Sequence, residues 1–504
     1  MKIKEINELL RMFEQYTVEI ASTIFIEFLA LTKDFEEKDW HYLWDKVKNI
    51  QNSRAKFIAG FEILDHISKV EIYEEYLSVL HSDESLDWDE RYFLWFQISK
   101  KLFGTTDISS EKLTQQQWLI YESIYQKFSS YFFDIPFINN RNENLIFITT
   151  QQFLNMKHGP TKTALDRAYI LKKLYKNVII INTAELLGGK PLELLHGEVG
   201  SYNENLLKVE KMKYKDETFS FVQLDNNMPN IENSKEFLNF VIKYKPLYIV
   251  NIGGNSMLID ICSKAVPVIN INTVPSGLTC TKATVQVIGR QLTKKDENLL
   301  ALLGKTKENV IVGRFTSSLK PQMNKYTRKE LDIPEEQFVI ALIGGRLTQE
   351  VTQEFIAMID EVLQKNVMLM IIGRMHNYED ICKNDPIFGK NAVYLEEQDD
   401  VLAILDLCDL YVNPKRAGGG TSVIEAMYKG CPAVTLNSGD VALGAGPDFC
   451  VSTYEEMQKQ IFRYMEDKEF YREMSIKAKK RVDYMLDSEN AFMEIIHQFE
   501  NKVL

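Results

Sequence analysis

Short apolar runs that alternate with amphipathic segments are the feature that most constrains how this chain can fold. From Asn144 onward the sequence contains the run NLIFITT, a loop, the helical pattern TKTALDRAYILKKLYK, and then the run NVIIINT. Continuous apolar runs of this length, separated by helices, are typical of parallel strands that are buried on both faces. The sequence therefore predicts an α/β fold built on parallel sheets.

This pattern occurs in two series. The runs PLYIVNIGG and VPVININTVPS continue the first series, and FVIALIGGRL, VMLMIIGRM, NAVYLEE, DLYVNP and PAVTL form the second. The polar stretch TSSLKPQMNKYTRKELDIPEE separates them. We expect two facing Rossmann-like units at residues 141–325 and 326–504, with the last helices crossing back to the first unit.

The first quarter of the chain has a different pattern. It contains all five tryptophans, and its apolar residues recur three and four positions apart. Glycine and proline are almost absent before Gly104, and no alternating strand pattern is visible. Residues 1–140 are therefore predicted to form an all-helical domain.

Bulk composition limits the classes of function. A chain of 504 residues exceeds the usual size of a single hydrophobic core, and its net charge of −12 disfavours nucleic acid as a partner. No apolar run approaches the roughly 18 to 20 residues of a membrane span, and the N-terminus lacks a secretory pattern. A cytoplasmic location is expected, and the six scattered cysteines are expected to be reduced.

The glycine-rich stretch NPKRAGGGTSVIEAMYKGCPAV is the main candidate for a binding site. Gly418, Gly419 and Gly420 follow a predicted parallel strand, so their loop emerges at the ligand-binding edge of the sheet. Ser422 and Glu425 have the spacing of a capping box, which would mark the start of a helix. Free N–H groups at that start could bind a phosphate or diphosphate, although glycines at this place could equally serve tight packing.

Two further segments could line the same cleft. Arg346 leaves the first strand of the second unit and could contact phosphate, although a surface arginine in a turn is the alternative. In the first unit, Gly254 and Asn255 lie between a strand and a helix, which predicts a second glycine-lined helix start. Together these segments indicate a ligand held between the two units.

A helical extension, two Rossmann-like units and the motif GGGTSVIEAMYKGCPAV resemble glycosyltransferases of the GT-B fold, over roughly Asn144 to the C-terminus. The resemblance implies that Glu425 binds the ribose hydroxyls of a nucleotide sugar, with UDP as the favoured carrier. It also implies that Thr421 and Ser422 meet the diphosphate.

Two positions depart from the retaining members of this group. Ala417 stands where they usually carry a glutamate, eight positions before Glu425, and Val351 stands where they tend to carry a lysine. The chain looks more like the inverting protein glucosyltransferases that modify bacterial adhesins, which in turn are similar to protein O-GlcNAc transferases. The resemblance implies transfer to a protein or glycan acceptor.

An inverting transfer needs charge stabilisation at the leaving group and a base for a hydroxyl acceptor. His158, in the loop after the first strand of the first unit, is the candidate base, and a loop histidine without a catalytic role is the alternative. The remaining candidates are Lys162 for diphosphate charge, Gln152 and Asn255 for hydroxyl groups, and residues 395–398, including Gln398, for the base.

No catalytic metal or other cofactor is expected. Asp87, Trp88 and Asp89 form an acid pair that resembles a metal motif of another glycosyltransferase fold, but they more simply begin a helix. The aromatic helical domain could mediate either homodimerisation or acceptor docking. Two other functions stay open, namely a non-catalytic subunit that acts as scaffold or chaperone for a glycosyltransferase or adhesin, and a sugar-nucleotide epimerase or phosphorylase.

Overall fold

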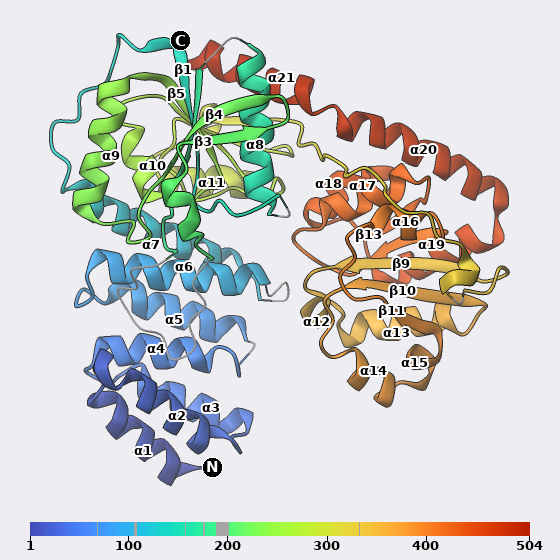
Figure 1. Ribbon diagram of the computed structural model, residues 1–504. Coiled ribbons are helices and arrows are strands. Elements are labelled where there is room, and N and C mark those ends of the chain that lie inside the picture. The colour runs from blue at the N-terminus through green and yellow to red at the C-terminus, as the bar shows by residue number, and fades with distance from the viewer. Residues whose placement is uncertain (68, 105–107, 157, 175–176, 188–200, 332) are drawn as a thin grey trace.

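The computed structural model divides the chain into a helical region and two α/β units (Figure 1). It describes residues 1–67, 69–104, 108–156, 158–174, 177–187, 201–331 and 333–504. The α/β class with two mainly parallel sheets, preceded by helices, is confirmed.

The helical region forms a stack at the N-terminal end of the molecule (Figure 1). Its helices begin at polar residues where the sequence supplies them, since the side chains of Asn52 and Ser110 accept hydrogen bonds from backbone N–H groups in the first turn. The helices are α1 (Ile3–Glu14), α2 (Ala21–Thr32), α3 (Glu37–Val47), α4 (Ser53–Ile63), α5 (Val70–Ser82), α6 (Trp88–Gly104) and α7 (Glu111–Ser129).

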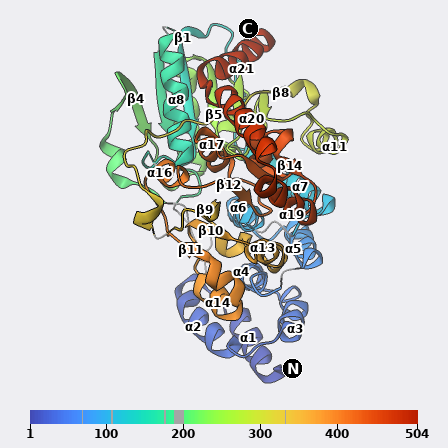
Figure 2. The ribbon, with the colours of Figure 1, turned by 90° about the vertical axis from the view of Figure 1, so that its right-hand side faces the viewer.

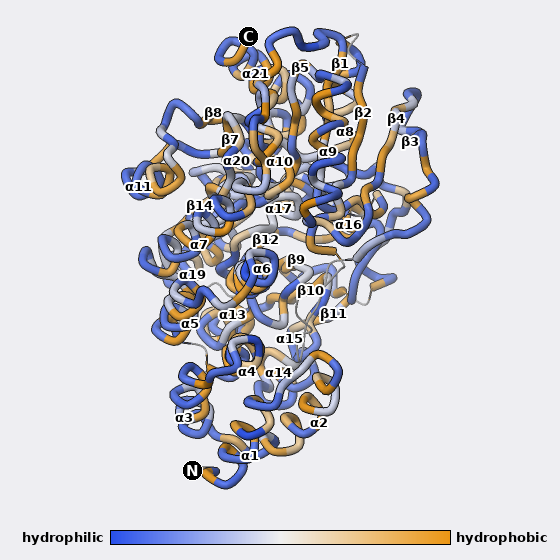
Figure 3. Tube along the Cα trace, turned by 90° about the vertical axis from the view of Figure 1, so that its left-hand side faces the viewer, coloured by the Kyte–Doolittle hydropathy of each residue, from blue (hydrophilic) through white to orange (hydrophobic). Residues whose placement is uncertain are grey.

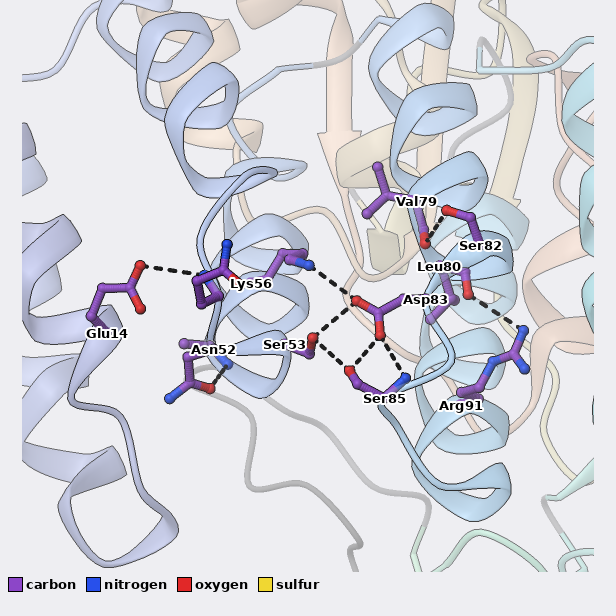
Figure 4. Close-up of polar contacts among 12 residues, drawn as sticks. Glu14, Asn52, Ser53, Lys56, Val79, Leu80, Ser82, Asp83, Ser85 and Arg91 are labelled. Carbon is purple, nitrogen blue, oxygen red and sulfur yellow. Dashed lines mark hydrogen bonds and ion pairs between the residues drawn. The ribbon is translucent and has the colours of Figure 1, made fainter.

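A polar cluster around Asp83 joins the start of α4 to the end of α5 (Figure 4). Its carboxylate accepts hydrogen bonds from Ser53 at 2.9 Å, Lys56 at 3.0 Å and Ser85. Burial alone would raise the pKa of Asp83, but these donors outweigh burial and lower the pKa to about 2. The cluster therefore holds the α5–α6 connection against α4 at neutral pH.

The first unit contains an eight-stranded sheet of order β3-β4-β2-β1-β5-β6-β7-β8, in which only β3 is antiparallel among the described residues. Helices α8 (Gly159–Lys173), α9 (Ile231–Tyr244), α10 (Met257–Cys262) and α11 (Lys294–Leu302) accompany it. The strands are β1 (Asn142–Thr150), β2 (Asn177–Asn182), β3 (Lys211–Tyr214), β4 (Glu217–Gln223), β5 (Pro246–Ile252), β6 (Val268–Ile271), β7 (Val285–Ile288) and β8 (Val310–Val312).

The second unit contains a parallel sheet of order β11-β10-β9-β12-β13-β14. Its strands are β9 (Phe338–Gly344), β10 (Val367–Gly373), β11 (Ala392–Tyr394), β12 (Leu410–Asn413), β13 (Ala433–Leu436) and β14 (Cys450–Val451). Its helices are α12 (Leu347–Glu350), α13 (Gln353–Leu363), α14 (Tyr378–Asn384), α15 (Pro386–Asn391), α16 (Val401–Leu405), α17 (Gly420–Tyr428), α18 (Gly439–Ala445), α19 (Tyr454–Glu466) and α20 (Lys468–Leu486).

The last helix, α21 (Ser488–Val503), leaves the second unit and packs on the first. Figure 2 shows α20 leading up to α21 beside the C-terminus. Phe492, Ile495 and Phe499 of α21 lie in one hydrophobic cluster with β1, β2 and β5, and the Tyr248 hydroxyl donates to Glu500 at 2.8 Å. The chain thus crosses between the units twice.

The helical region and one face of the first sheet share a single hydrophobic core. Trp44, Trp95 and Tyr121 belong to the same buried cluster as Phe147 and Ile249 of the sheet. The helices alternate hydrophobic and hydrophilic stretches, as amphipathic helices packed on a core do (Figure 3). None of the helices in the described residues combines the length and apolar character needed to cross a bilayer.

Two buried hydrogen bonds fix this shared core. The Tyr121 hydroxyl donates to the carboxyl of Asp260 at 2.6 Å, and the Tyr92 hydroxyl donates to Glu185 at 3.2 Å. Burial raises the pKa of Asp260 to about 6, although hydrogen bonds from Thr281 and Tyr121 oppose this rise. A buried carboxylate is costly without such donors, so these tyrosines determine where the helices dock.

We expect Tyr121→Phe to lower the free energy of unfolding by about 1.5 to 3 kcal/mol at pH 8, because it removes a donor from an ionised, buried carboxyl group. Tyr73→Phe is the matched control, since the Tyr73 hydroxyl donates at 3.2 Å to a neutral carbonyl, that of Leu64. Its loss should cost about 0.5 to 1.5 kcal/mol. Denaturant unfolding measures both, and equal losses would contradict a special role for the pair with Asp260.

Candidate functional site

A pocket of about 460 Å³ opens at the carboxyl edge of the second sheet. The ends of β9 and β10 and the loop after β12 surround it, which is where open parallel sheets bind ligands. Six of the predicted residues line it, namely Arg346, Gln398, Gly419, Thr421, Ser422 and Glu425. The fold thus brings Arg346 together with predicted residues that follow it by 52 or more positions in the sequence.

The glycine loop leads into α17 without a side-chain cap. Gly419 is the N-cap residue, with a left-handed φ of +89°, and no side chain accepts a hydrogen bond from the first turn there. The predicted capping box of Ser422 and Glu425 is therefore wrong. Ser422 lies inside the first turn, and its hydroxyl donates to the Gly419 carbonyl at 2.9 Å.

The earlier start of α17 follows from the backbone conformation of Gly419. Because Gly419 can adopt a positive φ, the chain enters the helix earlier than the position of Ser422 predicts. Thr421 and Ser422 of the first turn line the pocket, and no side chain caps the helix start, which is an arrangement that can bind anions.

The glycines also have a packing role. A Cβ atom on Gly419 would lie 2.9 Å from Cδ of Arg416, and one on Gly344 would lie 2.9 Å from its Nη2. Both glycines make room for the same arginine. A Cβ on Gly418 would meet no atom closer than Nη2 of Arg346 at 3.4 Å, so packing does not explain that glycine.

Arg416 and Glu350 are buried residues that the sequence analysis missed. Arg416 is 4% exposed, donates from Nη1 to the Ile343 carbonyl at 2.7 Å, and has Nη2 3.0 Å from Oε2 of Glu350. That last contact is within ion-pair distance, but its orientation makes no hydrogen bond. Nε of Arg416 also has no hydrogen-bond partner among the described residues. The position of Arg416 just before the glycine loop was the sequence feature that could have indicated its role.

Glu350 holds a second arginine as well. Nε of Arg346 donates to Oε1 of Glu350 at 3.3 Å, and the Glu350 side chain is only 4% exposed. One buried carboxylate thus faces two guanidinium groups, and Arg374 lines the same pocket. The arginines are suitable donors for a diphosphate, although Glu350, Glu397 and Glu425 also line the pocket and balance their charge.

Glu425 lies on the second turn of α17, on the side that lines the pocket. Burial raises the pKa of its carboxyl group to about 6, while Lys162 and Lys320 act in the opposite direction. Lys162 belongs to α8 of the first unit, and its ammonium donates to the Ser318 carbonyl at 2.7 Å. Burial lowers the pKa of Lys162. Glu425 and Lys162 therefore interact electrostatically between the two units.

His158 is the N-cap residue of α8 and is half-buried. Its Nδ1 lies 2.8 Å from the hydroxyl of Thr161, and burial lowers its pKa, so the ring is mainly neutral at pH 7. It is not among the residues that line the pocket in the second unit. Its catalytic role stays a prediction.

The helix start expected at Gly254 and Asn255 is not free. The carboxyl group of Glu185 accepts hydrogen bonds from the N–H groups of Met257 at 2.8 Å and Leu258 at 3.3 Å. The expectation of a second open anion site is wrong, because the chain supplies its own carboxyl group there. No local pattern indicates this contact, since Glu185 lies about 70 positions away.

The other candidates are placed as follows. The Gln152 side chain donates to the Ser201 carbonyl at 2.7 Å, and that of Gln398 donates to the Leu395 carbonyl at 2.9 Å. The pair Asp87 and Asp89 flanks the first residue of α6, as the helix-start interpretation predicts. No cluster of three or more potential metal ligands occurs within the described ranges.

Comparison with known proteins agrees with this geometry. Residues 323–481 match the family model of glycosyl transferases group 1. No curated protein matches the sequence. A variant of the Thermobaculum terrenum O-GlcNAc transferase superposes with a TM-score of 0.58 at 11% identity, covering 100% of this chain and 98% of that one.

A glycosyltransferase from Rickettsia africae ESF-5 superposes with a TM-score of 0.52 at 11% identity, covering 71% of this chain and 99% of that one. At these identities the superpositions establish the fold. The chain has the GT-B glycosyltransferase fold, with the group 1 sequence pattern in its second unit.

We expect Gly419→Ala to lower the free energy of unfolding by about 1 to 3 kcal/mol, because alanine would be strained at φ +89° and its Cβ would crowd Arg416. Gly418→Ala is the matched control, since its Cβ would meet only ordinary contacts, and it should change stability by less than about 1 kcal/mol. Denaturant unfolding without ligand measures both. Equal effects would show that the loop does not need glycine for packing at Gly419.

Proposed function

We propose that this protein transfers a sugar from a UDP-linked donor to a protein or glycan acceptor, with inversion at the anomeric carbon and without a metal. The observation that carries the proposal is the uncapped start of α17, which shares a pocket with Arg346, Arg416 and Glu425.

The diphosphate of the donor fits the helix start. The first-turn N–H groups of α17 and the positive end of its dipole would bind the phosphate oxygens. Arg346 would add charge-assisted hydrogen bonds, and the absence of a side chain at Gly418 leaves room for close approach. These groups also stabilise the charge that develops on the leaving diphosphate, so no metal is required.

The nucleoside would lie further along α17. Glu425 stands on the next turn after the helix start and lines the same pocket, so its carboxylate is within reach of the ribose hydroxyls. Gln398 lies in the loop after β11 at the edge of the pocket and is the candidate neighbour of the base. Carboxylate acceptors pair well with vicinal hydroxyls, as in other nucleotide sites.

Inversion is favoured by the side chains at two positions. Ala417 cannot act as an acid or bind sugar hydroxyls, and Val351 is 5% exposed within the core of the second unit. An inverting step needs a base on the acceptor side, and His158 is mainly neutral at pH 7. If Nδ1–H of His158 donates to Thr161, Nε2 keeps a lone pair that can accept the acceptor proton.

The helical region is the proposed acceptor side. It shares its core with the first unit, so an acceptor bound there would keep a fixed position relative to α8 and His158. Homodimerisation through the same region stays a prediction, which sedimentation velocity would test.

UDP binding and its pH dependence test the donor site. We expect wild-type protein to bind UDP and to release UDP from UDP-sugars, and Glu425→Ala to lose binding. Because the pKa of Glu425 is about 6, affinity should fall about tenfold between pH 7 and pH 5 as the carboxylate is protonated. The phosphate of UDP titrates nearby, so Glu425→Gln is the control that isolates the contribution of the carboxylate.

Calorimetric titration at several pH values measures this dependence. An equal pH dependence for wild type and Glu425→Gln would remove Glu425 from the site. Wild-type protein that neither binds UDP nor turns over any UDP-sugar would refute the enzyme and favour a non-catalytic subunit.

His158→Ala tests the acceptor side separately. We expect unchanged UDP affinity, because the ring does not line the donor pocket, together with a loss of transfer of about 100-fold or more. His158→Gln, which keeps polarity without a titratable group, should be equally impaired. An unchanged transfer rate in either variant would remove His158 as the base.

A further inference from the structure

Phe103 of the helical region contacts Arg346, a residue that lines the donor pocket. The ring of Phe103, near the end of α6, lies against the guanidinium of Arg346, with 4.9 Å between the ring centroid and Cζ. The C-terminal end of α6 points toward the second unit in Figure 1. Two parts of the chain that are more than 240 positions apart thus meet at the candidate diphosphate site.

We propose that Phe103 is a positioning residue, which orients Arg346 for the diphosphate and so makes the helical region part of the donor site. This inference deepens the proposed function and rests on it. This role of the helical region differs from acceptor docking and from dimerisation, because it would directly change the affinity for the donor.

The geometry of a guanidinium explains how such positioning works. A planar guanidinium can stack on an aromatic ring through its face, while its N–H groups point outward in its plane and stay available for hydrogen bonds. Here Nε donates to Glu350 at 3.3 Å, and Nη2 lies 3.4 Å from the Cβ position of Gly418. Nη2 therefore lies beside the glycine loop, where the diphosphate would lie.

Arg346 needs this support because its other contacts leave it free to move. Its side chain is 38% exposed and begins at the N-cap of α12, a helix of only four residues. Without the ring, its described interactions would be one hydrogen bond to Glu350 and an electrostatic interaction with Asp440. A long side chain held by few contacts loses more conformational entropy when it binds a ligand, so affinity falls.

A neighbouring pocket of about 480 Å³ lies between the helical region and the second unit, beside the contact of Phe103 with Arg346. Residues of α6 and α7, including Phe103 and Gln117, line one side of it, and Lys415, Arg416 and Gly439 line the other. Arg416 lines this pocket and the donor pocket alike. The helical region thus stands directly beside the glycine loop.

The test compares Phe103→Leu with Phe103→Tyr. Leucine keeps an apolar side chain but has no π face, whereas tyrosine keeps the face. We expect Phe103→Leu to raise the Kd for UDP about three- to tenfold and Phe103→Tyr to restore it to near the wild-type value. Phe133→Leu is the matched control, because Phe133 is 82% exposed and lies between α7 and β1.

A double-mutant cycle shows whether Phe103 acts through Arg346. In an Arg346→Met background, Phe103→Leu should have no further effect on Kd, because the cation that it positions is gone. A full additional loss in that background, or equal Kd values for Phe103→Leu and wild type, would overturn the inference. Thermal unfolding without ligand verifies that the variants fold.

Inorganic pyrophosphate separates this inference from the proposed function. Wild-type protein that binds pyrophosphate but not UDP would refute a nucleotide-sugar donor, while the same cycle measured with pyrophosphate would still decide the role of Phe103. Wild-type protein that binds neither would overturn both.

Discussion

A single buried carboxylate, Glu350, organises the candidate site. It forms ion-pair contacts with both Arg346 and Arg416, and without it two guanidinium groups would line one pocket with no shared carboxylate. The burial of Arg416 in turn requires glycine at Gly344 and Gly419, and Gly419 sets the start of α17. The glycines, the arginines and the uncapped helix are thus consequences of one ion-pair arrangement. Buried charges without partners are unstable, so these features must occur together.

A buried carboxyl group also organises a helix start in the first unit, but there it occupies the start itself. There Glu185 occupies the start of α10, and the hydroxyl of Tyr92 joins it from the helical region. A helix start that binds its own carboxyl group is a structural element, whereas one that faces a pocket lined by arginines is a binding element. The start of α10 is thus occupied by a carboxyl group, whereas the start of α17 has no side-chain cap and lies at a pocket.

The sequence predicted the features that depend on local pattern. Apolar periodicity located the helical region and both parallel sheets, and the order of strand, glycine loop and helix located the pocket at the carboxyl edge. It did not predict the contacts between distant residues. The cap at Gly419 depends on the fit of Arg416 against Glu350, and the occupied start of α10 depends on Glu185, about 70 residues earlier. Spacing within one segment cannot reveal a partner from another segment.

The short segment after β13, Gly439 and Asp440, contacts both the glycine loop of the candidate site and the first unit. Asp440 accepts a hydrogen bond at 3.1 Å from the N–H of Ser276 in the first unit, and burial raises the pKa of Asp440 to about 6. The preceding Gly439 leaves no room for a Cβ atom, since one would lie 2.2 Å from the Arg416 carbonyl. A displacement of the glycine loop by a ligand would therefore shift Gly439 and Asp440, and with them the contact to Ser276. Because the first unit shares its core with the helical region, the segment around the glycine loop is joined to the first unit by two described routes, one through Ser276 and one through Phe103.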